Sequence, residues 1–216
     1  MNRPPRLAAA VLTASAALLL TACGSGEGDG SSSGKIKGAD AGDTKASASA
    51  SAPASADGVK RPEITLSNDF QANFESWTNS DPKLQAILND GREELRAKYA
   101  AIIQGNPDSD AVTFYNSDAT LTSARKWIKQ FTGADNTVIG SVRVFEPQVH
   151  INDTGSGVLF YCVDERKAST KNHKTGKVIN TPDKPQSLIQ YRARLDKTPQ
   201  GLWKTASLTT VAGACS

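Results

Sequence analysis

The first residues of the chain limit where a folded domain can begin. Arg3 and Arg6 precede an apolar run from Leu7 to Leu20, and small residues follow that run. A basic start, a short apolar stretch and a small-residue exit are typical of a secretory signal that is removed from the mature protein. The run is shorter than the roughly 20 residues that a membrane-spanning helix needs. We therefore expect residues 1–22 to take no part in the fold.

Cys23 stands directly after Leu20, Thr21 and Ala22. This tetrapeptide resembles the bacterial lipobox, in which the cysteine thiol receives a diacylglycerol and the chain is cut just before it. The resemblance implies that the mature chain is lipid-anchored at the extracytoplasmic face of the plasma membrane, with Cys23 as the lipidation site. The alternative is an ordinary signal peptide in which the cysteine is incidental.

Removal of residues 1–22 changes the charge balance of the chain. The full sequence has 25 basic and 22 acidic residues, and the loss of Arg3 and Arg6 leaves 23 against 22, a net charge of +1. A nearly neutral chain exerts no long-range attraction on nucleic acid or anionic lipid. We therefore expect no nucleic-acid partner, and a membrane contact only through the N-terminal lipid.

Residues 23–60 have the composition of a disordered tether. They consist mainly of Gly, Ser, Ala, Asp and Lys, with Ala and Ser alternating around Pro53. Such a segment cannot bury enough apolar surface to offset the entropy that ordering costs. All the aromatic residues lie after residue 60. Residues 61–216 are therefore expected to form a single domain.

The spacing of apolar residues predicts the elements of this domain. Up to residue 133 the spacing is mainly helical, and after it the period is two. The expected elements are helices over 70–77 and 82–103, a short strand over 111–115, a helix over 118–132, and strands over 138–151, 158–164, 188–196 and 202–211. A polar, basic loop is expected between 167 and 185.

The long strand over 138–151 contains Pro147, and its apolar positions change parity across residues 145–147. This pattern predicts a β-bulge, because proline cannot donate to a sheet ladder. The order of elements predicts an α+β fold in which N-terminal helices pack on a curved, cone-like antiparallel sheet. A sheet curved by a bulge can leave a hollow at its open end.

Cys162 and Cys215 are the cysteines that remain if Cys23 is acylated. In an oxidising compartment such a pair usually forms a disulfide, whereas a buried pair of thiols or a metal site is the alternative. His150 and His173 are the only histidines, and their spacing is not that of a zinc site. We expect neither a metal nor a cofactor.

The disulfide sets a condition on the register of the last strands. Pairing around Pro199 and around the basic loop would place Cys162 near Ala193 and Thr205, far from Cys215. Either the tail after Val211 turns back, helped by a glycine at 213, or the register differs.

Two resemblances extend this reading. The succession of elements resembles the nuclear transport factor two-like fold, which ketosteroid isomerase and the SnoaL-like polyketide cyclases share. Separately, residues 161–168, which begin Tyr-Cys-Val-Asp, together with 174–178, 181–182 and the terminal Cys215, resemble an actinobacterial family of secreted or lipid-anchored proteins of unknown function. The resemblance to this family covers roughly residues 67–216. It implies no defined activity, because this fold includes enzymes and non-catalytic binding modules.

An enzyme of this fold would need a carboxylate base inside the cone. Asp164 is the candidate, because it continues the face of Val158, Phe160 and Cys162. It also lies at a strand end beside Glu165 and two basic residues, which favours an exposed, ion-paired terminus instead.

Basic residues near the polar loop form a second candidate site, which would bind an anion. The alternative is that these side chains only keep an exposed surface soluble. The residues are Lys167, Lys171, Lys174, Lys177, Arg192 and Arg194. Trp127 falls just off the inner stripe of its helix, so it is expected to face outward or toward the mouth of the hollow.

These features leave three functions open. The first is a lipid-anchored, non-catalytic module of the cell envelope that binds a small apolar ligand or an envelope protein. The second is a small isomerase- or cyclase-type enzyme that uses a carboxylate in the cone. The third is an accessory subunit of an envelope or export machine. An inward carboxylate with hydrogen-bond donors in a deep cavity would favour the enzyme, and a plain apolar cleft would favour the binding module.

Overall fold

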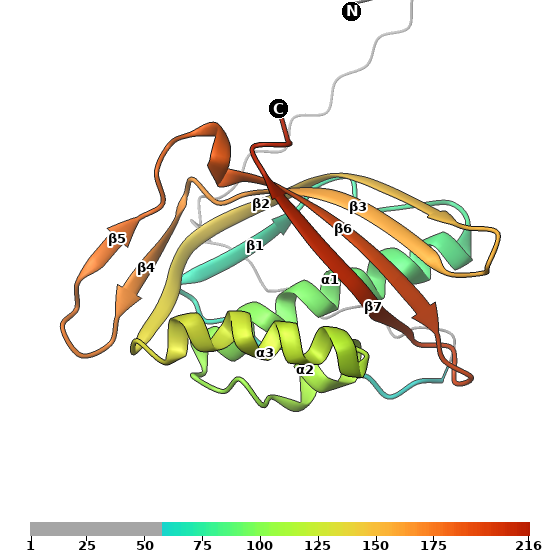
Figure 1. The fold of residues 1–216 in the computed structure, drawn as a ribbon, viewed down its shortest axis with the longest axis horizontal. Coiled ribbons are helices and arrows are strands. Elements are labelled where there is room, and N and C mark those ends of the chain that lie inside the picture. Colours follow the sequence, from blue (N-terminus) through green and yellow to red (C-terminus); the bar gives the residue numbers. More distant parts are fainter. Residues whose placement is uncertain (1–57) are drawn as a thin grey trace, which may run out of the picture. The chain divides into compact units, whose positions relative to one another are not determined.

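The computed structural model describes residues 58–216 (Figure 1). The signal peptide expected over 1–22, the lipidation site Cys23 and nearly all of the tether expected over 23–60 lie outside the described residues, so these three remain predictions. Residues 58–216 form an α+β structure of three α-helices and a curved seven-stranded sheet.

The central helix, α1 (Pro82–Ile103), begins where the sequence predicted. The Asp81 carboxylate accepts hydrogen bonds from the backbone N–H groups of Lys83 and Leu84, and Pro82 occupies the first turn. An acceptor at this position satisfies N–H groups that have no partner within the helix. The helix packs against the concave face of the sheet.

Gly91 allows α1 to lie close to the sheet. A Cβ atom at this position would lie 2.5 Å from Leu159 Cδ2. Glycine weakens a helix by about 1 kcal/mol relative to alanine. Here the loss is offset by closer packing of the helix on the sheet.

Two shorter helices follow α1. The α3 helix (Asp118–Thr132) is preceded by Ser117 and followed by Gly133, as predicted. The expected strand over 111–115 is wrong, because these residues form α2 (Asp110–Tyr115). Ala111, Val112 and Tyr115 are buried, and their spacing is that of one helix face. A segment this short carries too few residues to separate the two periods.

The sheet consists of seven strands in the order β5-β4-β2-β3-β6-β7, with β1 paired to β2. The strands are β1 (Phe70–Phe74), β2 (Asn136–Ile151), β3 (Gly157–Asp164), β4 (Ala168–Asn172), β5 (Val178–Asn180), β6 (Leu188–Lys197) and β7 (Trp203–Ala212). A short 3-10 helix, η1 (Pro185–Ser187), precedes β6. Within the described part of the chain every strand pair is antiparallel except β1 with β2.

The helix expected over 70–77 is also wrong. Its first residues form β1, which runs parallel to β2 from the pair Phe70–Gly140 to the pair Phe74–Val144. Phe70 and Phe74 are four residues apart, a spacing that places two side chains on one face of either a helix or a strand. The expected purely antiparallel sheet is corrected accordingly.

The polar loop expected over 167–185 is partly ordered as a hairpin, since β4 and β5 pair with each other and β4 pairs with the first half of β2. The bulge expected near Pro147 is confirmed. The register of β2 against β3 shifts between Phe145 and Gln148, and Glu146 has a φ of 52°.

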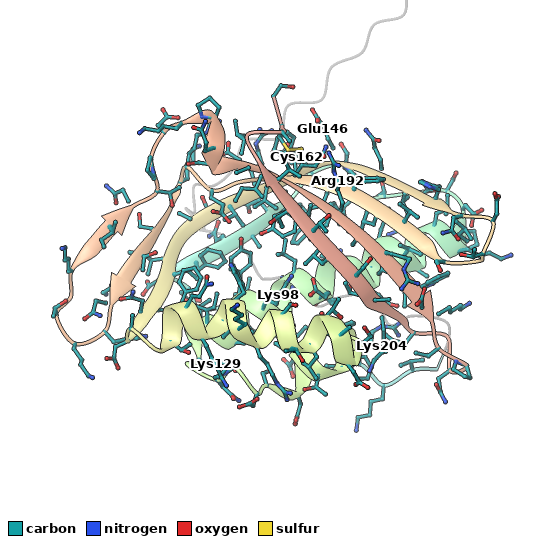
Figure 2. The ribbon with its side chains drawn as sticks, viewed as in Figure 1. Lys98, Lys129, Glu146, Cys162, Arg192 and Lys204 are labelled. Carbon is teal, nitrogen blue, oxygen red and sulfur yellow. A yellow bond between two sulfur atoms is a disulfide. The ribbon has the colours of Figure 1, made fainter. Side chains whose placement is uncertain are left out.

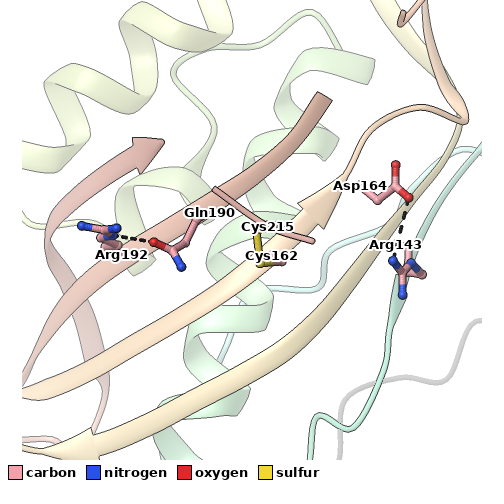
Figure 3. The surroundings of a disulfide bond; sticks show 6 residues. All are labelled: Arg143, Cys162, Asp164, Gln190, Arg192 and Cys215. Atoms are coloured by element: carbon pink, nitrogen blue, oxygen red, sulfur yellow. Dashed lines mark hydrogen bonds and ion pairs between the residues drawn. A yellow bond between two sulfur atoms is a disulfide. The ribbon is translucent and has the colours of Figure 1, made fainter. Parts of the chain in front are cut away.

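A disulfide joins Cys162 and Cys215, with a Cα–Cα distance of 6.0 Å (Figure 3). The pairing expected from sequence was wrong in register. Cys162 lies opposite Gln190, and Gln190 lies opposite Val211. The tail then needs only a short turn, made at residue 213, whose N–H donates to the Leu188 carbonyl.

The disulfide lies in a small apolar cluster with Phe145 and Leu188, separate from the main core. Cys162 alternates with the core residues Tyr161 and Val163, so it points to the opposite, convex face of the sheet. The bridge therefore fastens the C-terminus to the convex face. Among residues 58–216, no helix is long and apolar enough to span a membrane.

Candidate functional site

The start of α3 is fastened to β7. Asn116 and Thr205 form an isolated parallel bridge, and the Thr205 carbonyl accepts hydrogen bonds from the Ser117 N–H and the Thr120 hydroxyl. From this junction β7 rises away from α3 (Figure 1). A pocket of about 300 Å³ lies between α3 and the strands β6 and β7.

The lining of the pocket combines apolar side chains with a few polar ones. It is formed by Glu94 and Lys98 of α1, Asn116, Thr120, Ser123, Ala124, Trp127 and Phe131 in and before α3, Glu165 after β3, Ile189 and Tyr191 of β6, and Leu208 and Thr210 of β7. A concave, mostly apolar space with a few converging polar groups is the usual form of a small-molecule site.

Aromatic rings form two walls of this pocket. Trp127 makes edge-to-face contacts with Tyr99 and Phe131, with ring centroids 6.0 and 5.4 Å apart. Tyr191 stacks on Tyr161 with centroids 4.9 Å apart. Such contacts hold each ring in one orientation. Of the two orientations expected for Trp127, outward or toward the mouth of the hollow, the structure shows the second.

A buried ion pair forms the floor of the pocket. Lys98 Nζ lies 3.0 Å from Glu94 Oε1, and the two side chains are 5% and 3% exposed. Lys98 Nζ also lies 5.9 Å from the ring centroids of both Trp127 and Tyr191. Figure 2 shows Lys98 between α3 and the sheet.

Glu165 is the second carboxylate in the lining. Its side chain makes no hydrogen bond or ion pair with residues 58–216, and burial raises its pKa. Burial also raises the pKa of Tyr99 and of Tyr191, and the negative charge of Glu165 adds to both shifts. Glu165 is therefore a carboxylate inside the hollow whose charge is not balanced by a partner.

Asp164, the candidate base from sequence, does not line the pocket. Arg166 Nη2 lies 2.7 Å from its carboxylate and Arg143 Nη2 lies 3.9 Å away. The hydrogen bond from Arg166 is the main cause that lowers the pKa of Asp164. The residue is an ion-paired strand terminus on the convex face, beside Arg143 (Figure 3), which is the alternative that the sequence favoured. Its candidacy as a base inside the cone is corrected.

Sequence reasoning missed Glu165 by one residue. Tyr161 and Val163 belong to the core, and alternation along a strand places Glu165 on their side and Asp164 on the other. Each face of β3 carries one aromatic residue, Phe160 or Tyr161, so the sequence alone holds no signal that selects Glu165 over Asp164.

The six basic residues of the candidate anion site are not brought together. Lys171 lies on β4 and Arg192 on β6, and β2 and β3 lie between these strands. The charges also have local partners: Lys174 lies 2.7 Å from Asp135, and Arg194 pairs with Asp196. Arg192 donates to the Gln190 side chain (Figure 3). The candidate anion site spanning Lys167, Lys171, Lys174, Lys177, Arg192 and Arg194 is thus corrected, because the sheet separates its members.

Both histidines are exposed, His150 on β2 and His173 in the turn after β4. Within the described residues, no group of three or more His, Cys, Asp or Glu side chains is placed to hold a metal ion.

Neither a protein-family model nor a curated protein matches the chain. The resemblance to an actinobacterial family therefore stays a prediction.

Solved structures show a distant likeness. The intermembrane-space region of the chloroplast protein ARC6 is 8% identical, with a TM-score of 0.41 over 60% of this chain and 96% of that one. A protein from Catenulispora acidiphila is 10% identical, with a TM-score of 0.41 over 59% and 91%. A protein described as an aromatic ring hydroxylase, from Novosphingobium aromaticivorans, is 13% identical, with a TM-score of 0.40 over 57% and 86%. Likenesses of this size assign neither an activity nor a ligand.

Proposed function

We propose that this chain is a lipid-anchored extracytoplasmic protein whose domain binds a small, largely apolar molecule without transforming it. The observation that carries the proposal is the pocket between α3 and the strands β6 and β7. Its aromatic walls supply apolar contact area, and burial of apolar area drives association.

The proposed anchor is the lipid on Cys23, which the tetrapeptide over residues 20–23 supports. The proposed fold is the cone-like, nuclear transport factor two-like type. It is supported by a long helix on the concave face of a curved, bulged sheet and by a pocket beside that helix. An envelope protein as partner remains a sequence-based prediction.

The pocket is tested by closing its mouth. Ser123 is exposed and lines the pocket, so Ser123→Trp places a large ring at the opening without disturbing the core. The matched control is Gln130→Trp, an exposed position of the same helix outside the lining. The chain from residue 23 onward, carrying Cys23→Ser, is titrated with the neutral fluorescent dye 1-aminoanthracene. We expect wild type and Gln130→Trp to bind the dye, and Ser123→Trp to lose at least tenfold in affinity.

Equal dye affinity in all three chains would contradict binding in this pocket. Circular dichroism melting of the two tryptophan variants separates a blocked pocket from a misfolded one. A variant that melts like wild type and still fails to bind reports on the pocket alone.

The anchor is tested separately in the native host. Metabolic labelling with an alkyne analogue of palmitate should mark the wild-type chain, and Cys23→Ala should remove the label and leave the signal uncleaved. A labelled Cys23→Ala chain, or an unlabelled wild type released into water, would contradict the assignment.

A second candidate, an isomerase- or cyclase-type enzyme, has one observation in its favour. Glu165 is an inward carboxylate close enough to Tyr99 and Tyr191 to affect their titration, and burial raises its pKa, as in many general bases. A base of this kind would exchange a carbon-bound hydrogen of its ligand with D₂O. Exchange in wild type that Glu165→Gln abolishes would favour the enzyme; recovery of an unexchanged ligand would favour the binding module.

A further inference from the structure

The charged groups of the pocket do not balance one another. Among the described residues that line it, Glu94, Lys98 and Glu165 are the charged ones. Lys98 is 3.0 Å from Glu94, and this pair is neutral as a whole. With all three groups ionised, the pocket therefore carries one surplus negative charge, and that charge belongs to Glu165.

Arg166, beside Glu165 in the chain, and Lys98, the cation of the pocket lining, are already engaged. Arg166, its neighbour in the chain, donates to the carboxylates of Asp164 and Asp183, and Asp164 lies on the convex face. Lys98 is held by Glu94 and by the two aromatic walls. The other titratable groups that face Glu165 are Tyr99 and Tyr191, which are neutral at pH 7; burial raises the pKa of both further.

A partly buried carboxylate without a partner is unfavourable until something supplies a donor or a positive charge. A ligand that brings such a group relieves this cost on binding, whereas an anionic ligand adds to it.

We infer that the pocket takes a small molecule with an aromatic or alicyclic body and one protonated amine, and that the carboxylate of Glu165 is the group that recognises the amine. This inference rests on the proposed function, because it names the class of ligand for the same pocket. The aromatic walls hold the body of the ligand, and the amine lies at the Glu165 end. A volume of about 300 Å³ accommodates a bicyclic ring system with a short side chain.

Three probes of one shape and different charge test the inference. They are tryptamine (cationic), tryptophol (neutral) and indole-3-acetate (anionic), each titrated calorimetrically at pH 7 into the chain from residue 23 onward with Cys23→Ser. We expect tryptamine to bind about tenfold more tightly than tryptophol, and indole-3-acetate more weakly than both. Glu165→Gln should bring tryptamine down to the level of tryptophol. The matched control Glu63→Gln, an exposed glutamate outside the pocket, should change nothing.

The possible results distinguish a failure of the amine preference from a failure of ligand binding in this pocket. If tryptamine and tryptophol bind equally and Ser123→Trp weakens both, the amine preference is overturned and the binding pocket stands. If indole-3-acetate binds best, Lys98 and not Glu165 recognises the ligand, and the inference is also overturned. If no probe binds to wild type and 1-aminoanthracene does not bind either, the proposed function itself is overturned. Melting of Glu165→Gln at or above the wild-type temperature shows that any loss of binding is not a loss of folding.

Discussion

Asp90 and Glu94 are carboxylates one turn apart on α1, and their surroundings differ. Asp90 is fully buried and accepts hydrogen bonds from Arg61 Nε at 2.8 Å and from the Trp203 N–H at 2.9 Å. Glu94 has a single ion pair, with Lys98 at 3.0 Å, and it lines the pocket together with the unpaired Glu165. Two neighbouring turns of α1 therefore carry buried carboxylates with different numbers of hydrogen-bond donors.

The difference between these carboxylates separates a charge that stabilises the fold from a charge that is available to a ligand. The hydrogen-bond donors to Asp90 are Arg61, which precedes β1, and Trp203 of β7. The carboxylate therefore joins α1 to two other parts of the chain. Buried polar groups are normally satisfied, and those that are not are candidates for a role in binding. We therefore expect Asp90 to stabilise the fold and Glu165, which lines the pocket beside Glu94, to recognise the ligand.

The largest expected effect is at Asp90, whose buried carboxylate accepts hydrogen bonds from two other parts of the chain. Asp90→Ala removes a buried carboxylate and leaves the Arg61 guanidinium and the Trp203 N–H without this acceptor. We expect the free energy of unfolding to fall by about 3–5 kcal/mol, measured by urea denaturation. Asp90→Asn keeps an acceptor and should lose less. A loss below 1 kcal/mol for Asp90→Ala would contradict the structural role.

The disulfide gives the next largest effect, on the opposite face of the sheet. Replacing both Cys162 and Cys215 by serine opens a loop with a sequence separation of 53. We expect a loss of about 2–4 kcal/mol in the free energy of unfolding. Dye binding in the pocket should stay within twofold of wild type, because the bridge lies on the convex face. A large loss of binding in a folded double variant would show that the tail also shapes the pocket.

Gly91 tests the close approach of α1 to the sheet. Gly91→Ala gains helix propensity, but its Cβ would overlap Leu159 Cδ2. We expect a net loss of about 1–3 kcal/mol, since overpacking costs more than the propensity gain. Thermal melting checks this, and an increase in melting temperature would show that Leu159 can move aside.

The smallest expected effect on stability has the opposite sign and concerns Glu165, the carboxylate of the pocket that has no partner. Burial raises the pKa of Glu165 above its usual value, so the folded state disfavours the charged carboxylate. This unfavourable contribution is present at pH values above the raised pKa and disappears as the pH falls below the unfolded value. We expect Glu165→Gln to stabilise the chain by about 1 kcal/mol at pH 7 and to leave stability unchanged at pH 3.5. Destabilisation at pH 7 would mean that the carboxylate has a partner.

The sequence predicted those elements whose ends carry a chemical signal. Asp81 with Pro82, and the glycine at 133, mark helix ends, and Pro147 marks the bulge. The first strand was predicted as a helix, because two phenylalanines four residues apart fit both periods. The β4–β5 hairpin has an exposed, mostly polar sequence, so no apolar alternation marks it.

The candidate site depended on information that a single sequence does not contain. Which face of β3 meets the helices is decided by packing, and that choice exchanges Asp164 for Glu165. The pocket itself arises where α3 leaves β7 beyond Thr205. Such a separation depends on contacts between elements that are distant in the chain.

Native mass spectrometry of the mature chain purified from its own host tests the central claim most directly. We expect part of the wild-type chain to carry one additional small mass that is released on denaturation. Gln130→Trp should retain this mass and Ser123→Trp should lose it. A wild-type chain without any such mass, or the same mass on Ser123→Trp, would contradict a ligand in the pocket between α3 and β7.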